Sequence, residues 1–217
     1  MSTETPRTPF DMGAGRMEAF SDAVMAVIIT LLAFELKPPD GTNLSAVSDT
    51  VPSFLIYVLS FLLVAIYWNN HHHLLRASDR ISGTVMWANM LLLFCLSLIP
   101  VSTEWLGNAY NDTLSQGWDL WKPVAFFGVV SLAAALAYTW LVRALIRANG
   151  PDSPFTRAIH KDVKGKLSLA LYTLGIVTAV TVKNAYLAYA CYAAVSVMWL
   201  IPDRRFTHAH EGDEHPH

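Results

Sequence analysis

The sequence predicts an all-α integral membrane protein with six transmembrane helices in each chain. Three observations predict this class. Hydrophobic residues make up 53% of the 217 residues and charged residues only 15%, whereas about 25% of a soluble domain is charged. Apolar runs close to the roughly 20 residues that cross a bilayer recur along the chain. Lysine and arginine gather on one set of the connections between those runs, as they do on the cytoplasmic side of membrane proteins.

Six apolar runs are long enough to serve as spans, and the last two are short. In chain order the predicted spans cover residues 16–36, 53–75, 83–106, 123–146, 166–182 and 186–201. Only Lys183, Asn184 and Ala185 separate the last two, which predicts a tight helical hairpin. The domain organisation that follows is a polar N-terminal segment over 1–15, a membrane domain over 16–202 and a His-rich, disordered cytoplasmic tail over 203–217.

The orientation follows from the fifteen lysines and arginines. One side collects Arg7, Arg16, Arg76, Arg80, Arg143, Arg147, Arg157, Lys161, Lys164, Lys166, Arg204 and Arg205. The other side holds Lys37, Lys122 and Lys183. Because the cytoplasmic side is the positive one and the number of spans is even, both termini are predicted to be cytoplasmic. A multi-pass protein of the plasma membrane is expected.

The first span begins with charges, in the stretch RMEAFSDAVMA. Six residues separate Arg16 from Asp22, which is about 9 Å along a helix axis. Asp22 is therefore expected inside the membrane boundary. An ionisable group at that depth is costly, and it usually faces the protein interior with a partner.

Polar side chains lie at a similar depth in the next two spans. The second span ends in YWNNHHHLLR, which contains Asn69, Asn70 and three histidines, and the third span reaches Asn89. We expect one buried hydrogen-bond network, in which Ser21 and Asp22 accept from His and Asn donors. This network can be a structural brace or a gating element, and the sequence does not decide between them. The residues assigned to the motif and network are Arg16, Phe20, Ser21, Asp22, Asn70, His72, His73 and Asn89.

Arg16 followed after three residues by Phe20-Ser21-Asp22 resembles the R-x-x-x-F-S-D pattern of the endolysosomal potassium-channel family, transmembrane protein 175. The stretches AVMAVIITLL, WNNHHHL and NMLLLFCLSLIP extend the resemblance through three spans. The animal proteins carry two six-helix repeats and this chain carries one. The resemblance therefore implies a prokaryotic homologue and four copies around one pore. It also implies that the first spans line the pore, without a carbonyl filter loop, and that potassium, with other monovalent cations, is the permeant ion.

One helical face of the first span is a candidate pore lining. Val27, Leu31 and Phe34 fall at i, i+4 and i+7, with Thr30 at the edge of the same face. Apolar rings from four copies would form the constriction and the gate. The alternative is that this stripe is helix-packing core. Phe34 departs from the family, in which the outermost position resembles leucine.

Two acidic residues, Glu35 and Asp40, follow the candidate pore face and are expected to raise the local cation concentration at the outer mouth. Two other functions compete with a channel. The first is a secondary or proton-coupled transporter that uses Asp22 and His72. The second is a membrane metalloenzyme, suggested by the eight histidines.

Metal binding and catalysis find little support in the sequence. The spans contain no histidine pair at the helical spacing that suits chelation. The tail histidines, His208, His210, His215 and His217, are better explained as a solvated end. No nucleotide, phosphate or nucleophile motif is present. We expect no enzyme, no metal, no cofactor other than the permeant potassium ion, and no nucleic-acid partner.

Overall fold

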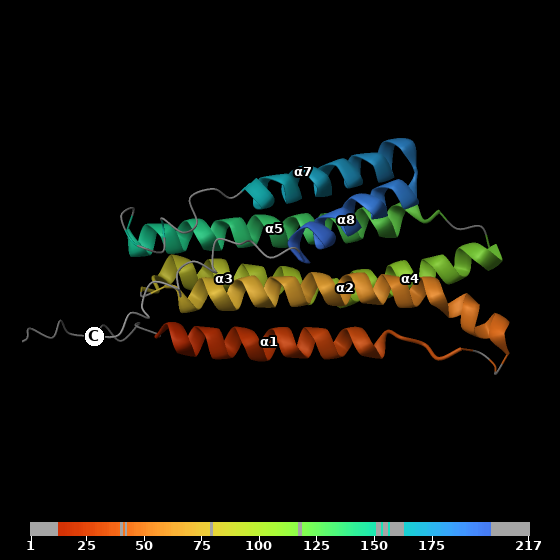
Figure 1. The fold of residues 1–217 in the computed structure, drawn as a ribbon. Helices are drawn as coiled ribbons and strands as arrows, with labels where there is room; N and C mark the ends of the chain where they lie inside the picture. Colours follow the sequence, from red (N-terminus) through yellow and green to blue (C-terminus); the bar gives the residue numbers. More distant parts are fainter. Residues whose placement is uncertain are drawn as a thin grey trace, which may run out of the picture.

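The computed structural model describes residues 13–39, 41, 43–78, 80–116, 119–150, 153, 156 and 163–200, without the side chains of residues 45, 46 and 111–116. The regular structure within these residues is helical throughout, and Figure 1 shows the helices as an elongated bundle. The helices in chain order are α1 (Ala14–Phe34), α2 (Leu44–Arg76), α3 (Gly83–Ser97), α4 (Ile99–Gln116), α5 (Trp121–Asn149), α7 (Val163–Val177), the π-helical turn η1 (Thr178–Val182) and α8 (Ala185–Leu200).

In the part of the chain that the structure describes, five helical stretches are long and apolar enough to cross a membrane, and the shorter apolar helix α8 follows them. Each stretch overlaps one predicted span. Helix α2 begins at Leu44 rather than residue 53 and contains Pro52, and α4 ends at Gln116 rather than residue 106. The first turns of α2 were missed because they carry Ser48, Asp49 and Thr50, which a search for apolar runs passes over. The predicted segments 1–15 and 203–217 lie almost entirely outside the described residues.

The third predicted span is divided in two. Helix α3 ends at Ser97, where the N–H of Leu98 donates to the carbonyl of Cys95 (3.2 Å), and α4 starts again at Ile99. Pro100 explains the division, because it has no N–H to donate to the carbonyl of Leu96. Together the two helices form one apolar stretch from Gly83 to Tyr110. The span predicted over 83–106 is therefore compatible with the structure, in which it consists of two consecutive helices.

The tight hairpin between the last two predicted spans is confirmed. Lys183 adopts a left-handed conformation (φ 56°, ψ 28°) at the end of η1. The side-chain oxygen of Asn184 then accepts a hydrogen bond from the N–H of Leu187 (2.9 Å) and starts α8. Such an Asn cap satisfies one of the free N–H groups at a helix start. Chain reversal therefore takes only two residues.

Successive apolar stretches run in opposite directions, with α3 and α4 forming one stretch, so charged helix ends collect at the two ends of the bundle (Figure 1). The end at which α1 begins also holds the end of α2, the start of α3 and the end of α5. Asn149 connects two of these ends, since its amide donates to Ser78 Oγ (2.8 Å) and accepts from the N–H of Arg80 (3.1 Å). Among described basic residues, those nearer this end are Arg16, Arg76, Arg80, Arg143, Arg147, Lys164 and Lys166; those at the other are Lys37, Lys122 and Lys183.

Helix α5 packs against α3, α4, α7 and α8, whereas α1 lies at one edge and packs mainly on α2, with α3 and α4 (Figure 1). At the α5–α7–α8 contact, the ring of Tyr192 lies against Gly128 and Gly175, where a Cβ atom on either glycine would overlap it. These glycines let the three helices approach closely, as small residues do in membrane bundles. The edge position of α1 leaves one of its faces uncovered.

Candidate functional site

The uncovered face of α1 is the one that the sequence assigned to the pore. Val27, Leu31 and Phe34 are 57%, 46% and 82% exposed, and Thr30 beside them is exposed as well. The neighbouring face is different: Ile28 and Leu32 are 3% and 0% exposed, because they pack into the bundle. Within one chain, the stripe is therefore not helix-packing core.

The hydroxyl of Thr30 is directed back at its own helix. It lies 2.7 Å from the carbonyl oxygen of Ala26 and 2.9 Å from that of Val27. A threonine that donates to the preceding turn loses its only donor to the backbone. The exposed face consequently offers no free hydrogen-bond donor at Thr30, although the hydroxyl oxygen can still accept, and Phe20 (48% exposed) extends the face toward the start of α1.

Behind this face, a chain of buried hydrogen bonds joins three helices. Asn89 of α3 donates from Nδ2 to Ser21 Oγ of α1 (2.9 Å), and its Oδ1 accepts from His71 Nε2 of α2 (2.7 Å). The hydroxyl of Ser21 donates to the carbonyl of Met17 (2.8 Å). The side chains of Ser21, His71 and Asn89 are completely buried. Because buried polar groups without partners are costly, this chain fixes the rotation of α1 against α2 and α3.

The structure distributes the other assigned residues differently from the expectation. Asn70 does not join the buried chain, because its amide donates to the carbonyl of Ile66 in its own helix (2.8 Å). The histidine that binds Asn89 is His71, rather than His72 or His73. His73 is exposed, and its ring meets that of His72 edge-on. The reason is helical rotation: successive residues turn by about 100°, so only one of three adjacent histidines can face α3.

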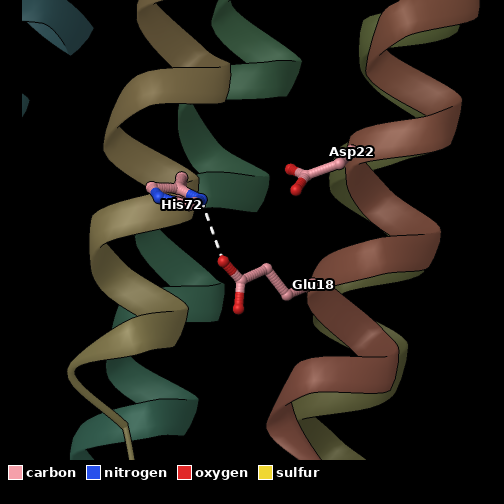
Figure 2. A group of neighbouring side chains, drawn as sticks. All are labelled: Glu18, Asp22 and His72. Atoms are coloured by element: carbon pink, nitrogen blue, oxygen red, sulfur yellow. Dashed lines mark ion pairs between the residues drawn. The ribbon is translucent and has the colours of Figure 1, made fainter.

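A second polar group lies next to the buried chain and is half-buried. Glu18 Oε1 is 2.9 Å from His72 Nδ1 and 3.4 Å from Arg76 Nε. Asp22 Oδ1 accepts a hydrogen bond from the indole Nε1 of Trp68 (3.0 Å). Figure 2 shows Glu18 and Asp22 projecting from α1 toward His72 on α2. The expectation that Asp22 accepts from Asn or His donors is therefore corrected: its donor is Trp68.

Sequence reasoning missed Glu18, Trp68 and Arg76, although the spacing contains a signal. Glu18 and Asp22 are four residues apart on α1, and Trp68, His72 and Arg76 are four residues apart on α2. Residues at i and i+4 share one face of a helix. The acidic side chains on this face of α1 and the basic or N–H-bearing side chains on this face of α2 form two rows with the same spacing. We call the two facing rows the ladder, and their opposite chemistry favours pairing between the two helices.

Arg16 is exposed near the start of α1. At the opposite end of α1, Glu35 lies in a small recess with Lys37 and Glu104. Partial burial raises the pKa of Glu35, the carboxylate of Glu104 raises it further, and Lys37 lowers it. Lys37 Nζ donates to Asn108 Oδ1 (2.8 Å). Asp40, the other residue predicted at the outer mouth, lies outside the described residues.

Comparisons with known proteins identify the family. The family model described as the endosomal/lysosomal potassium channel TMEM175 matches residues 16–100. A potassium channel of a Chryseobacterium species is 43% identical over 194 residues, covering 89% of this chain and 96% of that protein. The chain belongs to the TMEM175 family. A potassium channel of Streptomyces collinus is 32% identical to this TMEM175 member, and the match covers 75% of this chain and 78% of the Streptomyces protein.

A solved structure supports the fold. The crystal structure of a lysosomal potassium-selective channel TMEM175 homologue from Chamaesiphon minutus matches with a TM-score of 0.73 and 23% identity, covering 87% of this chain and 96% of that chain. The family resemblance inferred from the R-x-x-x-F-S-D pattern is thus confirmed. This TMEM175 protein is a multi-pass membrane protein, and residues 16–100 contain both the exposed face of α1 and the buried hydrogen-bond chain.

Asn89→Ala tests the buried chain. The substitution removes both bonds of the Asn89 amide and leaves Ser21 and His71 without their inter-helix partner. We expect a loss of about 1 to 3 kcal/mol in the free energy of unfolding, measured as a lower thermal midpoint of the detergent-purified protein. The matched control is Asn108→Ala, which removes an exposed bond to Lys37 and is expected to change stability by less than about 0.5 kcal/mol. Equal midpoints for the two variants would contradict a bracing role for Asn89.

Proposed function

We propose that this chain forms a potassium-preferring cation channel in the plasma membrane, with both termini in the cytoplasm. The observation that carries the proposal is the apolar face of α1, which a member of the TMEM175 family leaves uncovered by the rest of its own chain. Its relatives in Chryseobacterium and Streptomyces collinus are named potassium channels. The exposed side chains elsewhere on the bundle, such as Leu136 and Leu174, are suited to contact with lipid.

The proposed channel is a homotetramer in which α1 of each copy faces a central axis. A single exposed helix face cannot enclose a path, and closed symmetry lets one face serve every subunit. The edge position of α1 suits this arrangement, because it presents the stripe without obstruction from α5, α7 or α8. The number four comes from the resemblance to the two-repeat animal proteins.

The proposed constriction and gate consist of rings of Val27, Leu31 and Phe34, with Thr30 at their edge. A narrow apolar ring excludes water and therefore stops a hydrated ion, so small changes in its width open and close the path. The hydrogen-bond chain through Ser21 acts as a brace that holds the rotation of α1 and so decides which side chains face the axis. Glu35 and Asp40 supply negative charge at the outer mouth, which raises the local cation concentration.

Channel function predicts unitary currents. Protein reconstituted into planar bilayers should show current steps, and the reversal potential should move with the potassium gradient more than with an equal sodium gradient. An ion path through the bilayer carries discrete currents, whereas a carrier that uses Asp22 and His72 gives a flux that saturates and shows no steps. A saturating, step-free flux would overturn the channel in favour of a secondary or proton-coupled transporter.

The proposed tetramer predicts the mass of the purified complex. Native mass spectrometry of the detergent-purified chain, at 24.0 kDa per copy, should show four copies. Leu31→Glu should weaken the assembly, because it places four carboxylates around one axis. The control Leu136→Glu puts the same charge on an exposed position of α5 that faces lipid in this arrangement. A monomeric protein that conducts like the wild type would contradict the tetramer.

The register of the pore face predicts the effect of single substitutions. Leu31→Ala should widen the ring, raise the basal current and raise the sodium-to-potassium permeability ratio several-fold, and Leu31→Ser should leak further because it holds water. Since Leu31 is 46% exposed, its loss should cost at most about 0.5 kcal/mol of stability. Recordings on each variant provide the measurement.

Leu32→Ala is the adjacent control for this register. Leu32 is fully buried, so its truncation should cost about 2 to 5 kcal/mol of stability while leaving the permeability ratio of the assembled channel unchanged. If Leu32→Ala alters the permeability ratio and Leu31→Ala does not, the face around Ile28 and Leu32 lines the path instead.

A further inference from the structure

The geometry points to a zinc-binding site formed by Glu18, Asp22 and His72 at the contact between α1 and α2. The ligand atoms of these three side chains all lie within 4.8 Å of one another. Figure 2 shows the two carboxylates reaching from successive turns of α1 toward the imidazole on α2. The site goes beyond the proposed channel, because the chain can bind a metal here whether or not it conducts ions.

The donor set selects the metal. One imidazole nitrogen, two carboxylate oxygens and a water molecule are each ligands that zinc accepts, and together they supply the four positions of its tetrahedral sphere. Magnesium and calcium prefer sets made only of oxygen and are bound less well by imidazole. A tetrahedral zinc ion with bonds of about 2.0 to 2.1 Å holds its ligands about 3.3 Å apart. His72 Nδ1 and Glu18 Oε1 are already 2.9 Å apart, so it is mainly Asp22 that must move inward.

The surroundings fit a cation in that position. Trp68 donates to one oxygen of Asp22 (3.0 Å), which orients the carboxylate and leaves its other oxygen for the metal, as such supporting bonds do in metal sites. Trp68 also stacks on the ring of His72, with 5.8 Å between centroids. Two carboxylates near one arginine leave the cluster negative when His72 is neutral. Arg76 is 3.4 Å from Glu18 and 69% exposed, so its side chain is free to swing toward solvent as the metal enters.

Access and exchange are also available. The side chains of His72 and Glu18 are 23% and 18% exposed, whereas the ligand atom His72 Nδ1 is itself buried. An ion that enters from the end of the bundle at which α1 begins therefore reaches it after a small movement of these side chains. Zinc takes the place of any proton shared between Glu18 and His72, and that proton goes to solvent, because only the neutral imidazole binds a metal. Zinc would link α1 to α2 by coordinate bonds and stabilise the folded chain by mass action.

The test uses the full chain with His208, His210, His215 and His217 replaced by alanine, so that metal on the tail is not counted. We expect this parent protein, stripped with a chelator, to take up one equivalent of zinc in competition with a metal-sensitive dye, and its thermal midpoint to rise with zinc but not with the same concentration of magnesium or calcium. His72→Ala and Glu18→Gln should each weaken zinc binding at least about tenfold. The matched control, His73→Ala, removes the adjacent exposed histidine and should bind as the parent does.

His72→Cys provides a readout that does not depend on losing binding. The Nδ1 atom is the ring nitrogen nearest to Cβ, so a thiolate at position 72 lies close to the same place. With Co²⁺ as the probe, this variant should gain a thiolate-to-cobalt charge-transfer band in the near ultraviolet. The parent, which contains Cys95 and Cys191, should lack that band. Absence of zinc uptake by the parent, parental affinity in folded His72→Ala, or absence of the band in folded His72→Cys would each overturn the site.

Discussion

The hydrogen-bond chain from His71 through Asn89 to Ser21 is the constraint on which the arrangement of α1 depends. In a bilayer, apolar side chains gain little by leaving lipid for a neighbouring helix, so packing and polar contacts must hold helices together. Helix α1 has neighbours on one side only. A rotation of 100° would separate Ser21 from Asn89 and turn Leu32 outward in place of Leu31. The buried polar groups thus determine which apolar side chains are exposed.

The ladder of Glu18 and Asp22 against Trp68, His72 and Arg76 adds a second connection on the same side of α1. The two connections differ in character. The chain through Asn89 is fully buried, and each of its bonds depends on the others. The ladder is partly open to solvent and combines an ion pair with hydrogen bonds, so it is weaker per contact and can exchange partners. The chain through Asn89 fixes the orientation of α1, whereas the ladder can rearrange when an ion from solvent binds to it.

Much of this site could be predicted from the sequence. Asp22 and Ser21 stand out because charged and polar groups inside an apolar run need partners, and Asn89 stands out at the same depth of a neighbouring span. Helical periodicity alone also groups Val27, Leu31 and Phe34 on one face. The choice among His71, His72 and His73 could not be predicted, since it depends on the rotation of α2 about its axis. Trp68 was passed over because tryptophan at a span end is ordinarily an interface anchor.

The same distinction applies to the fold: hydropathy predicts where the apolar helices lie, but it does not predict where each helix begins or is interrupted. The apolar runs located the apolar helices, and Lys183 with Asn184 marked the hairpin. The extension of α2 back to Leu44 could not be read from hydropathy, because its first turns are polar. The interruption at Leu98 could have been predicted, since Pro100 removes a donor from the helical ladder; hydropathy does not detect it because proline and its neighbours remain apolar.

The alternation of helix directions also affects how such a bundle can be enlarged. Helix α8 runs back toward the end of the bundle at which α1 begins (Figure 1). Two copies of the unit can therefore be joined head to tail by a short polar connection, with no extra crossing and no inversion of the second copy. A gene duplication would then give a chain with two copies of the first helix, and each could change independently. In the proposed tetramer, the uncovered stripe on α1 would then no longer have to complement only itself, so one ring of the proposed pore could carry two kinds of side chain.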